Sequence, residues 1–181
     1  TRAYGLYSAG FYDTDGLVDI EVYVSGHQGT TDVIADVKNQ KAYVALDGPI
    51  ERENLTIAGK DCTLIKLHGI SHLVVEAEED REFVDKALEV LKKDYKDDAY
   101  GVLFFNKEKL EMIPYVYVEG SETLFREGSC GSGTVAVVNY LESDIDKLDE
   151  DYKIAIKNPA GELEVFVYEF EDGKKFCVGG K

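Results

Sequence analysis

Basic residues are scarce in this chain of 181 residues, where 20 Lys and Arg stand against 36 Asp and Glu and the net charge is −16. Phosphate neutralisation requires clustered cations, so this balance argues against a nucleic-acid partner. An acidic surface does not attract anionic lipid either. Apolar runs such as Val135–Val138 fall far short of the ~20 residues that a bilayer span needs. With no secretory signal in view, we expect a cytoplasmic protein.

Cysteine and histidine are also few. Three widely spaced cysteines form neither a disulfide framework nor a zinc set, and His27, His68 and His72 do not complete zinc spacing with them. We therefore predict free thiols and no metal site. The remaining composition, 44% hydrophobic and 31% charged residues, is typical of a globular chain with a sizeable core.

Strand patterns dominate the chain, with few helices. Asp80–Asp94 is the clearest helix because its apolar residues share one face and Asp80 stands near its start. Thr1–Phe11 and Gly131–Leu141 are small and apolar all round, which predicts two buried helices. Alternation predicts strands at Val18–Val24, Thr31–Val37, Ala42–Leu46, Cys62–Leu67, Ser71–Glu76, Gly101–Phe105, Met112–Val118, Tyr152–Ile156, Leu163–Phe170 and Lys175–Val178. The predicted class is α+β.

A short internal repeat suggests two similar halves. Thr1–Tyr7 (TRAYGLY) aligns with Thr134–Tyr140 (TVAVVNY), and both stretches are apolar helices among strands. We therefore predict two pseudo-symmetric lobes, each a curved, mostly antiparallel sheet around a central helix. Residues 1–55 would be the second half of an N-terminal lobe, 56–170 a C-terminal lobe, and 171–181 a terminal strand returning to the N-terminal lobe. The boundary is placed where polar residues and Pro49 break the strand pattern.

The segment Glu127–Thr134 (EGSCGSGT) carries the chemistry. A helix that opens at Gly131 would place Cys130 at its positive end, where a thiol pKa falls and the reactive thiolate is favoured. Glycines let backbone N–H groups approach a ligand closely, so the donors of Gly131, Ser132, Gly133 and Thr134 are candidates for binding a carboxylate. A thiol beside such donors suits removal of the α-proton of an amino acid.

Each of these features also has an ordinary structural interpretation. A Gly/Ser-rich stretch is usually a loop, and a single Cys is usually inert packing. A phosphate-binding P-loop is excluded because no Lys follows the last glycine. Cys62 and Cys177 lie within strand patterns and are interpreted as packing residues.

Residues 130–134 (CGSGT) and the apolar helix after them resemble the second catalytic motif of the diaminopimelate epimerase superfamily, which includes the proline racemases and a histidine racemase of metallophore synthesis. The resemblance covers the whole chain. Gly69–Val75 resembles the family's Gly-Asn-Pro-His segment, Tyr100–Phe104 its Asn-Val-Glu-Phe strand, and Thr1–Tyr7 the helix after its first motif. The form of the motif is closest to the histidine-racemase type.

The resemblance implies a mechanism in which two cysteines face each other across the α-carbon, with no cofactor and no metal. Cys130 would be one of them, and residues 131–134 would hold the substrate carboxylate. His72 matches a family histidine near the site, although a structural role stays open. Glu127 would tune the thiol or accept the substrate ammonium, and an exposed loop carboxylate is the competing interpretation.

Two departures from the family shape the prediction. Ile70 and Gly101 stand where family asparagines grip the distal end of diaminopimelate, and the family's Glu-Arg pair is not in place in Glu119–Glu127, which argues against that substrate. The first catalytic motif would fall before Thr1, so we expect a fragment with half of a two-base site, inactive alone.

The leading hypothesis is therefore a cofactor-independent racemase or epimerase of a free amino acid, its substrate unassigned. A proton-shifting isomerase of an unsaturated acid and a non-catalytic amino-acid or carboxylate-binding protein on the same scaffold are the alternatives. A homodimer is left open.

Overall fold

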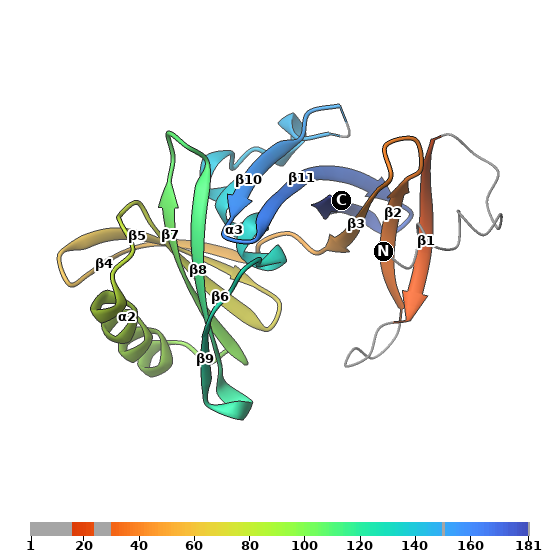
Figure 1. Cartoon of the computed structure of the whole chain (residues 1–181). Coiled ribbons are helices and arrows are strands. Elements are labelled where there is room, and N and C mark those ends of the chain that lie inside the picture. The colour runs from red at the N-terminus through yellow and green to blue at the C-terminus, as the bar shows by residue number, and fades with distance from the viewer. Residues whose placement is uncertain (1–15, 24–29, 150, 181) are drawn as a thin grey trace.

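A computed structural model describes residues 16–23, 30–149 and 151–180 of the chain (Figure 1). Its strands in the first half are β1 (Leu17–Tyr23), β2 (Thr30–Asp36), β3 (Lys41–Leu46), β4 (Glu51–Ile57), β5 (Lys60–Leu67) and β6 (Ile70–Val75). Those in the second half are β7 (Ala99–Asn106), β8 (Glu111–Val118), β9 (Thr123–Arg126), β10 (Ile154–Asn158), β11 (Gly161–Phe170) and β12 (Gly173–Gly180). Two α-helices, α2 (Arg81–Asp94) and α3 (Gly131–Leu141), and two 3-10 turns, η1 (Glu119–Ser121) and η2 (Ile145–Lys147), complete it. The predicted α+β class is confirmed.

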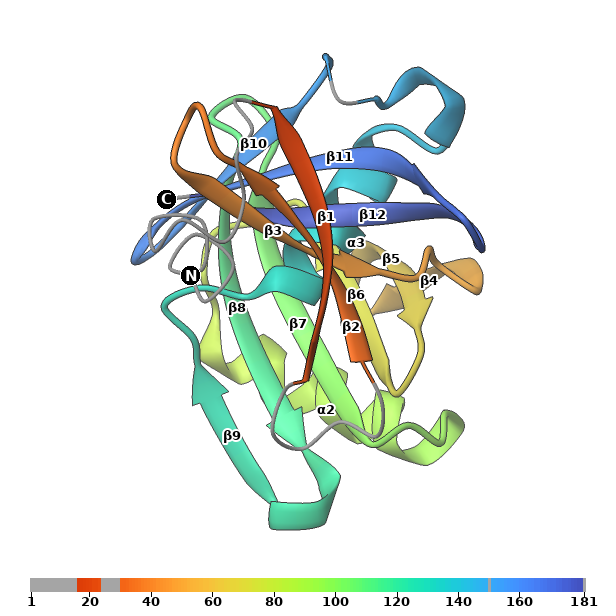
Figure 2. The ribbon, with the colours of Figure 1, turned by 90° about the vertical axis from the view of Figure 1, so that its right-hand side faces the viewer.

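All twelve strands belong to one sheet. Their order is β1-β2-β3-β12-β11-β10-β8-β7-β6-β5-β4, with β9 added on β8. Every pairing is antiparallel except β6 with β7 and β10 with β8. The last strand, β12, lies between β3 and β11, so it pairs with the first part of the chain as well as with its own hairpin partner (Figure 2).

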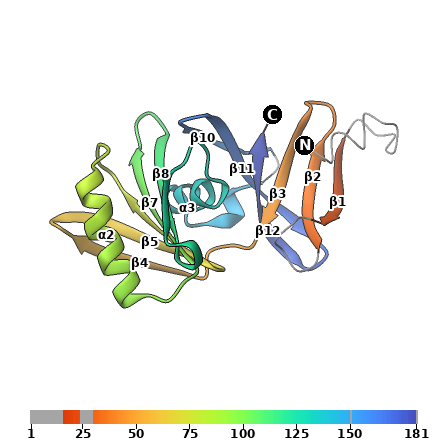
Figure 3. The ribbon, with the colours of Figure 1, turned by 60° about the horizontal axis from the view of Figure 1, so that its bottom comes forward.

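Helix α3 lies inside the curve of this sheet, with strands on several sides of it (Figure 3). It contacts β5, β6 and β7 on one side and β10, β11 and β12 on the other. Its residues Val135, Ala136, Val137 and Val138 are all 0% exposed. The prediction of a buried helix at Gly131–Leu141 is therefore confirmed. The helix has no polar face in its sequence because strands enclose it on several sides.

Helix α2 covers the opposite face of the sheet, over β4 and β7. The Asp80 side chain accepts the N–H groups of Glu82 and Phe83, both at 3.1 Å, and so caps the helix. One face of α2 is buried through Phe83, Val84, Ala87, Leu88 and Leu91. The predicted apolar face is confirmed, and it packs against the side of β4–β8 that α3 does not touch.

Residues 51–57 form a strand, and the expectation that this stretch interrupts the strand pattern was wrong. β4 pairs with β5 over its whole length, from Glu51 with Lys66 to Ile57 with Lys60. It is an edge strand whose first four residues are exposed and polar, a composition that protects sheet edges from further pairing. The boundary at residue 55 therefore falls inside β4. The expected helix Thr1–Phe11 lies outside the described residues. No helix among the described residues is long and apolar enough to span a membrane.

Candidate functional site

Cys130 occupies the N-cap position of α3, as the sequence predicted for a helix that opens at Gly131. The chain reaches it from β9 through a short loop, residues 127–129. The Glu127 N–H donates to Pro114 O at 2.9 Å, and Gly128 O accepts from Ala160 N–H at 2.7 Å. Strand β8 and the β10–β11 turn therefore hold the loop that presents the thiol.

The Cys130 side chain is 6% exposed and belongs to the core cluster around α3. Burial raises the pKa of its thiol to about 11, against a downward effect of the Gly133 N–H that points at the sulfur. The negative charge of Glu127 raises the pKa further. The predicted lowering of the pKa is therefore wrong: the positive helix end acts as expected, but desolvation outweighs it, because the thiol faces the apolar core.

Two of the four N–H donors in the first turn of α3 lie close to groups of Cys130. The Gly133 N–H lies near the Cys130 sulfur and lowers the pKa of the thiol, without a cap hydrogen bond from the side chain. The Thr134 N–H donates to Cys130 O at 2.9 Å, and the Thr134 hydroxyl donates to the same oxygen at 2.7 Å. Of the four donors proposed from the sequence, those of Gly131 and Ser132 remain for a bound carboxylate, with the Ser132 hydroxyl beside them.

Glycine at 133 has a packing reason. A Cβ there would stand 3.1 Å from the Cys130 sulfur and 3.1 Å from Leu103 Cδ2. The small residue therefore lets the thiol lie against the first helical turn.

His72 reaches the site from β6 through Ser132. Its Nε2 lies 2.9 Å from the Ser132 hydroxyl, and that hydroxyl lies 3.7 Å from the Cys130 sulfur. The imidazole is 0% exposed, and burial lowers its pKa to about 3. A Cβ at Gly101 would fall 2.0 Å from His72 Nδ1, so the ring occupies the space that this glycine leaves on β7. His72 is thus a neutral residue joined to Cys130 by way of Ser132.

Glu127 is half-buried and stands next to the thiol. Its negative charge is one of the causes of the raised thiol pKa. The structure therefore brings Cys130, Ser132, His72 and Glu127 together. The sequence reasoning missed Asn158, whose side-chain Oδ1 accepts the Cys130 N–H at 3.1 Å. The one signal at that position is the Asn-Pro dipeptide at a strand end, which indicates a turn and no function.

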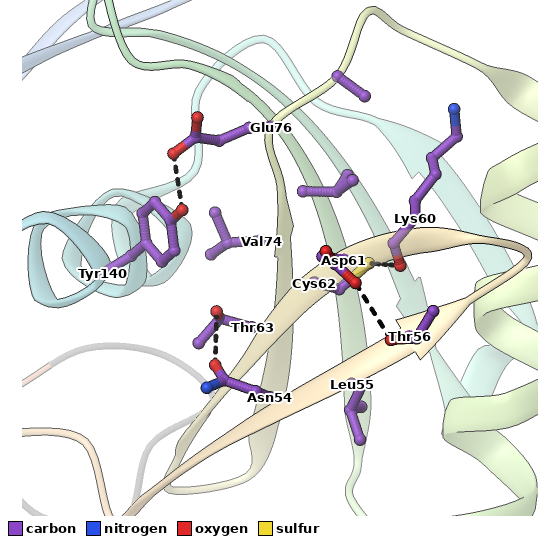
Figure 4. Close-up of a pocket in the computed structure, with 12 residues that line it drawn as sticks. Asn54, Leu55, Thr56, Lys60, Asp61, Cys62, Thr63, Val74, Glu76 and Tyr140 are labelled. Atoms are coloured by element: carbon purple, nitrogen blue, oxygen red, sulfur yellow. Dashed lines mark hydrogen bonds between the residues drawn. The ribbon is translucent and has the colours of Figure 1, made fainter.

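Two hollows lie near α3. The larger, about 690 Å³, is formed by β4, β5, β6 and the far end of α3 at Tyr140. Its polar side chains bond to one another: Figure 4 shows the Tyr140 hydroxyl pointing to Glu76, 2.6 Å away, and Thr63 pointing to Asn54, 3.0 Å away. The smaller, about 430 Å³, includes Ser132 in its wall together with residues of β2, β3 and the β5–β6 turn. The hollow next to Ser132 is the one that adjoins the donors of α3.

The other two thiols lie apart from this site. Cys62 packs in the cluster beneath α2, and Cys177 packs with Tyr43 and Phe166 on the other face of β12. Burial raises the thiol pKa to about 11 for Cys62 and about 12 for Cys177. Within the described part of the chain, no second thiol faces Cys130, and no group of three or more His, Cys, Asp or Glu side chains is placed to hold a metal ion.

The comparisons with known proteins by sequence agree on one family. A protein-family model described as "Histidine racemase CntK N-terminal domain" matches residues 5–177. Two proteins named histidine racemase, from two strains of Fusobacterium nucleatum subsp. nucleatum, are 32% identical over 142 residues and 29% identical over 153 residues. These matches cover 75% and 79% of this chain but 52% and 56% of the relatives, so the matched part is about half of their length.

A solved structure supports the fold alone. The crystal structure of a Bacillus anthracis phenazine biosynthesis protein of the PhzF family superposes with a TM-score of 0.54 at 11% identity, covering 99% of this chain and 70% of that one.

Proposed function

Because the chain belongs to the family of the histidine racemase N-terminal domain, we propose that it forms one half of a cofactor-independent racemase that inverts the α-carbon of a free amino acid. Cys130 is the proton-transferring thiol of this half. The observation that supports the proposal most is the position of Cys130 at the N-cap of α3, with the N–H groups of Gly131 and Ser132 beside it.

The substrate carboxylate binds at the N–H groups of Gly131 and Ser132, where the positive helix end attracts an anion. This places the α-carbon beside the Cys130 sulfur. When the thiolate takes the α-proton, the electron pair moves into the carboxylate, and the same N–H groups stabilise the added charge. A second proton is delivered by an acid on the opposite face, which inverts the carbon, while the abstracted proton stays on Cys130. Since the other described thiols lie in other clusters, this second acid comes from outside the described residues, and the 181-residue chain alone is expected to be inactive.

Glu127 gives the buried thiol a route to its reactive form. Its negative charge raises the thiol pKa, which favours the protonated thiol in the free protein. A substrate ammonium beside Glu127 offsets its negative charge, which lowers the thiol pKa as substrate binds. His72 acts through Ser132. With its proton on Nε2, the imidazole donates to the Ser132 hydroxyl, whose own hydrogen then points toward the sulfur or the substrate carboxylate.

Histidine is the first substrate to test, because both relatives carry that name. The architecture we propose for the whole enzyme is two pseudo-symmetric lobes with the substrate between them. Strands β1–β3 with β12 belong to the N-terminal lobe, and the C-terminal lobe begins at β4 and carries Cys130.

The proposal is tested by incubating L-histidine and a panel of other L-amino acids with the gene product that contains residues 1–181, followed by chiral chromatography. We expect the D-enantiomer of at least one amino acid to accumulate. The reaction should persist after dialysis against a chelator and a carbonyl reagent, because the mechanism uses protein groups only. Racemisation that depends on pyridoxal phosphate would refute the proposed chemistry.

The raised thiol pKa favours one second candidate, a non-catalytic amino-acid-binding protein on this scaffold. In that case histidine or another amino acid would bind at the α3 donors without racemisation. Calorimetric titration of the same panel separates the two functions.

A further inference from the structure

The side chain of Asn158, at the end of β10, has hydrogen-bond partners at both ends of its amide. Its Oδ1 accepts the Cys130 N–H at 3.1 Å. Its Nδ2 donates to the Thr134 hydroxyl oxygen at 3.3 Å and to Ile156 O at 3.2 Å. The residue is 7% exposed, so water does not compete for these groups. Asn158 is 28 residues from Cys130 in sequence.

These bonds close a ring around the backbone of Cys130. Its N–H is taken by Asn158, and its C=O is taken by the hydroxyl and the N–H of Thr134. Asn158 and Thr134 are bonded to each other, which completes the ring. Both backbone polar groups of Cys130 are therefore fixed by side chains, and its conformation, with φ −131° and ψ 107°, follows from them.

An amide is the group that this position requires. Asn158 must accept from one N–H and donate to two oxygens, and asparagine has an acceptor and two donor hydrogens on one short side chain. A carboxylate keeps the acceptor and loses the donors. An apolar side chain loses both and leaves the buried Cys130 N–H without a partner, which is costly.

We propose that Asn158 is a positioning residue for Cys130, which holds the sulfur inside the apolar core against the first turn of α3 at Gly133, where a bound amino acid meets it. This rests on the proposed function in one respect only, namely that Cys130 moves the proton. The positioning itself concerns the thiol of the chain as it stands. Without the amide, the segment 128–130 is free to swing outward, and the thiol gains water and loses its fixed direction.

The test measures alkylation of Cys130 by iodoacetamide in the 181-residue chain across pH 6 to 11, with each cysteine followed separately by peptide mass spectrometry. In Asn158→Leu, we expect the rate at pH 8 to rise by more than about tenfold and the pH midpoint to fall toward that of an ordinary thiol, because the sulfur leaves the core. In Asn158→Asp, the midpoint should stay at or above that of the wild type, because the variant keeps the acceptor and adds a negative charge.

Asn139→Leu is the matched control. Asn139 is also buried, on the same helix, but at the end remote from Cys130, so its replacement should leave the alkylation of Cys130 unchanged. Thr134→Val opens the ring on the other side and should move the midpoint in the same direction as Asn158→Leu, by less. If circular dichroism shows that Asn158→Leu is unfolded, Thr134→Val takes its place in the test.

Wild-type rates and midpoints in folded Asn158→Leu, or in Thr134→Val if the leucine variant is unfolded, would overturn the inference. The same variants in the longer gene product separate it from the proposed function. Positioning predicts a faster-alkylated Cys130 together with slower racemisation. If alkylation shifts as expected but no wild-type protein racemises any amino acid, the inference stands and the proposed function fails.

Discussion

The imidazole of His72 is buried, and this burial lowers its pKa from an ordinary value near 6.5 to about 3. Between these two values the unfolded chain binds a proton at His72 and the folded chain does not. The free energy of unfolding therefore falls as the pH falls through this window, by about 1.4 kcal/mol per pH unit from this residue. We expect His72→Gln to lack this contribution, so its stability declines less steeply toward acid.

The measurement is urea unfolding of both proteins at several values between pH 7 and pH 4. Carboxylates titrate in the same range, but they are common to both chains and cancel in the comparison. Parallel stability profiles for wild type and His72→Gln would show that the imidazole is accessible to protons in the folded state.

At this scale the sequence predicted the helix start after Cys130 but not the state of its thiol. The spacing of glycines around Cys130 is sufficient to predict a helix start and a group of N–H donors. The direction in which the thiol pKa shifts could not be predicted, because it depends on how deeply the Cys130 sulfur is buried. Leu103, Val135 and the other residues that exclude water from the sulfur surround it only after folding. The contact of Asn158 with Cys130 could not be predicted for the same reason, since the two residues are 28 positions apart in the sequence.

The pairing of β12 with β3 joins the first strands to the rest of the sheet, and Gly179 is the residue that permits its closest approach. A Cβ at Gly179 would fall 2.0 Å from Ala42 O. Backbone cannot move aside as a flexible side chain does, so we expect Gly179→Ala to lower the free energy of unfolding by about 1–3 kcal/mol. Hydrogen exchange should accelerate in β3 and β12 before it does in β7 and β8.

Gly120→Ala serves as the control for this variant, because nothing lies within 4 Å of the Cβ position in η1. Its stability and exchange should match those of the wild type. Gly179→Ala with unchanged exchange in β3 would mean that the two strands are not as closely paired as described.

The elements with a clear apolar pattern, whether one-sided or uniform, were predicted from the sequence, and the elements without such a pattern were not. α2 follows its one-sided pattern, and α3 follows its uniformly apolar one. β4 was missed because an edge strand needs no apolar face, and β9 because four residues carry too little pattern. The position of β12 between β3 and β11 is a long-range pairing that no local pattern encodes.

In the described chain a sheet encloses one helix, and a thiol lies at that helix's N-terminal end. The matched relatives are about twice as long as the segment they share with it. Whole-molecule activity therefore has to be measured on the gene product that contains these residues, and the measurement must report on proton transfer itself rather than on its net outcome.

Exchange of the substrate α-proton with deuterated solvent, followed by proton NMR, is that measurement. We predict that the α-proton signal of L-histidine or another amino acid decays with the wild-type protein and with Cys177→Ala, whose thiol packs in a different cluster. The measurement is made on both enantiomers, because each base of a two-base site removes the α-proton of one of them. With Cys130→Ala the signal of one enantiomer should persist, because its base is gone and the carboxylate donors alone cannot remove a proton. Undiminished exchange of both enantiomers in Cys130→Ala would contradict the assignment of Cys130 as the proton-transferring group.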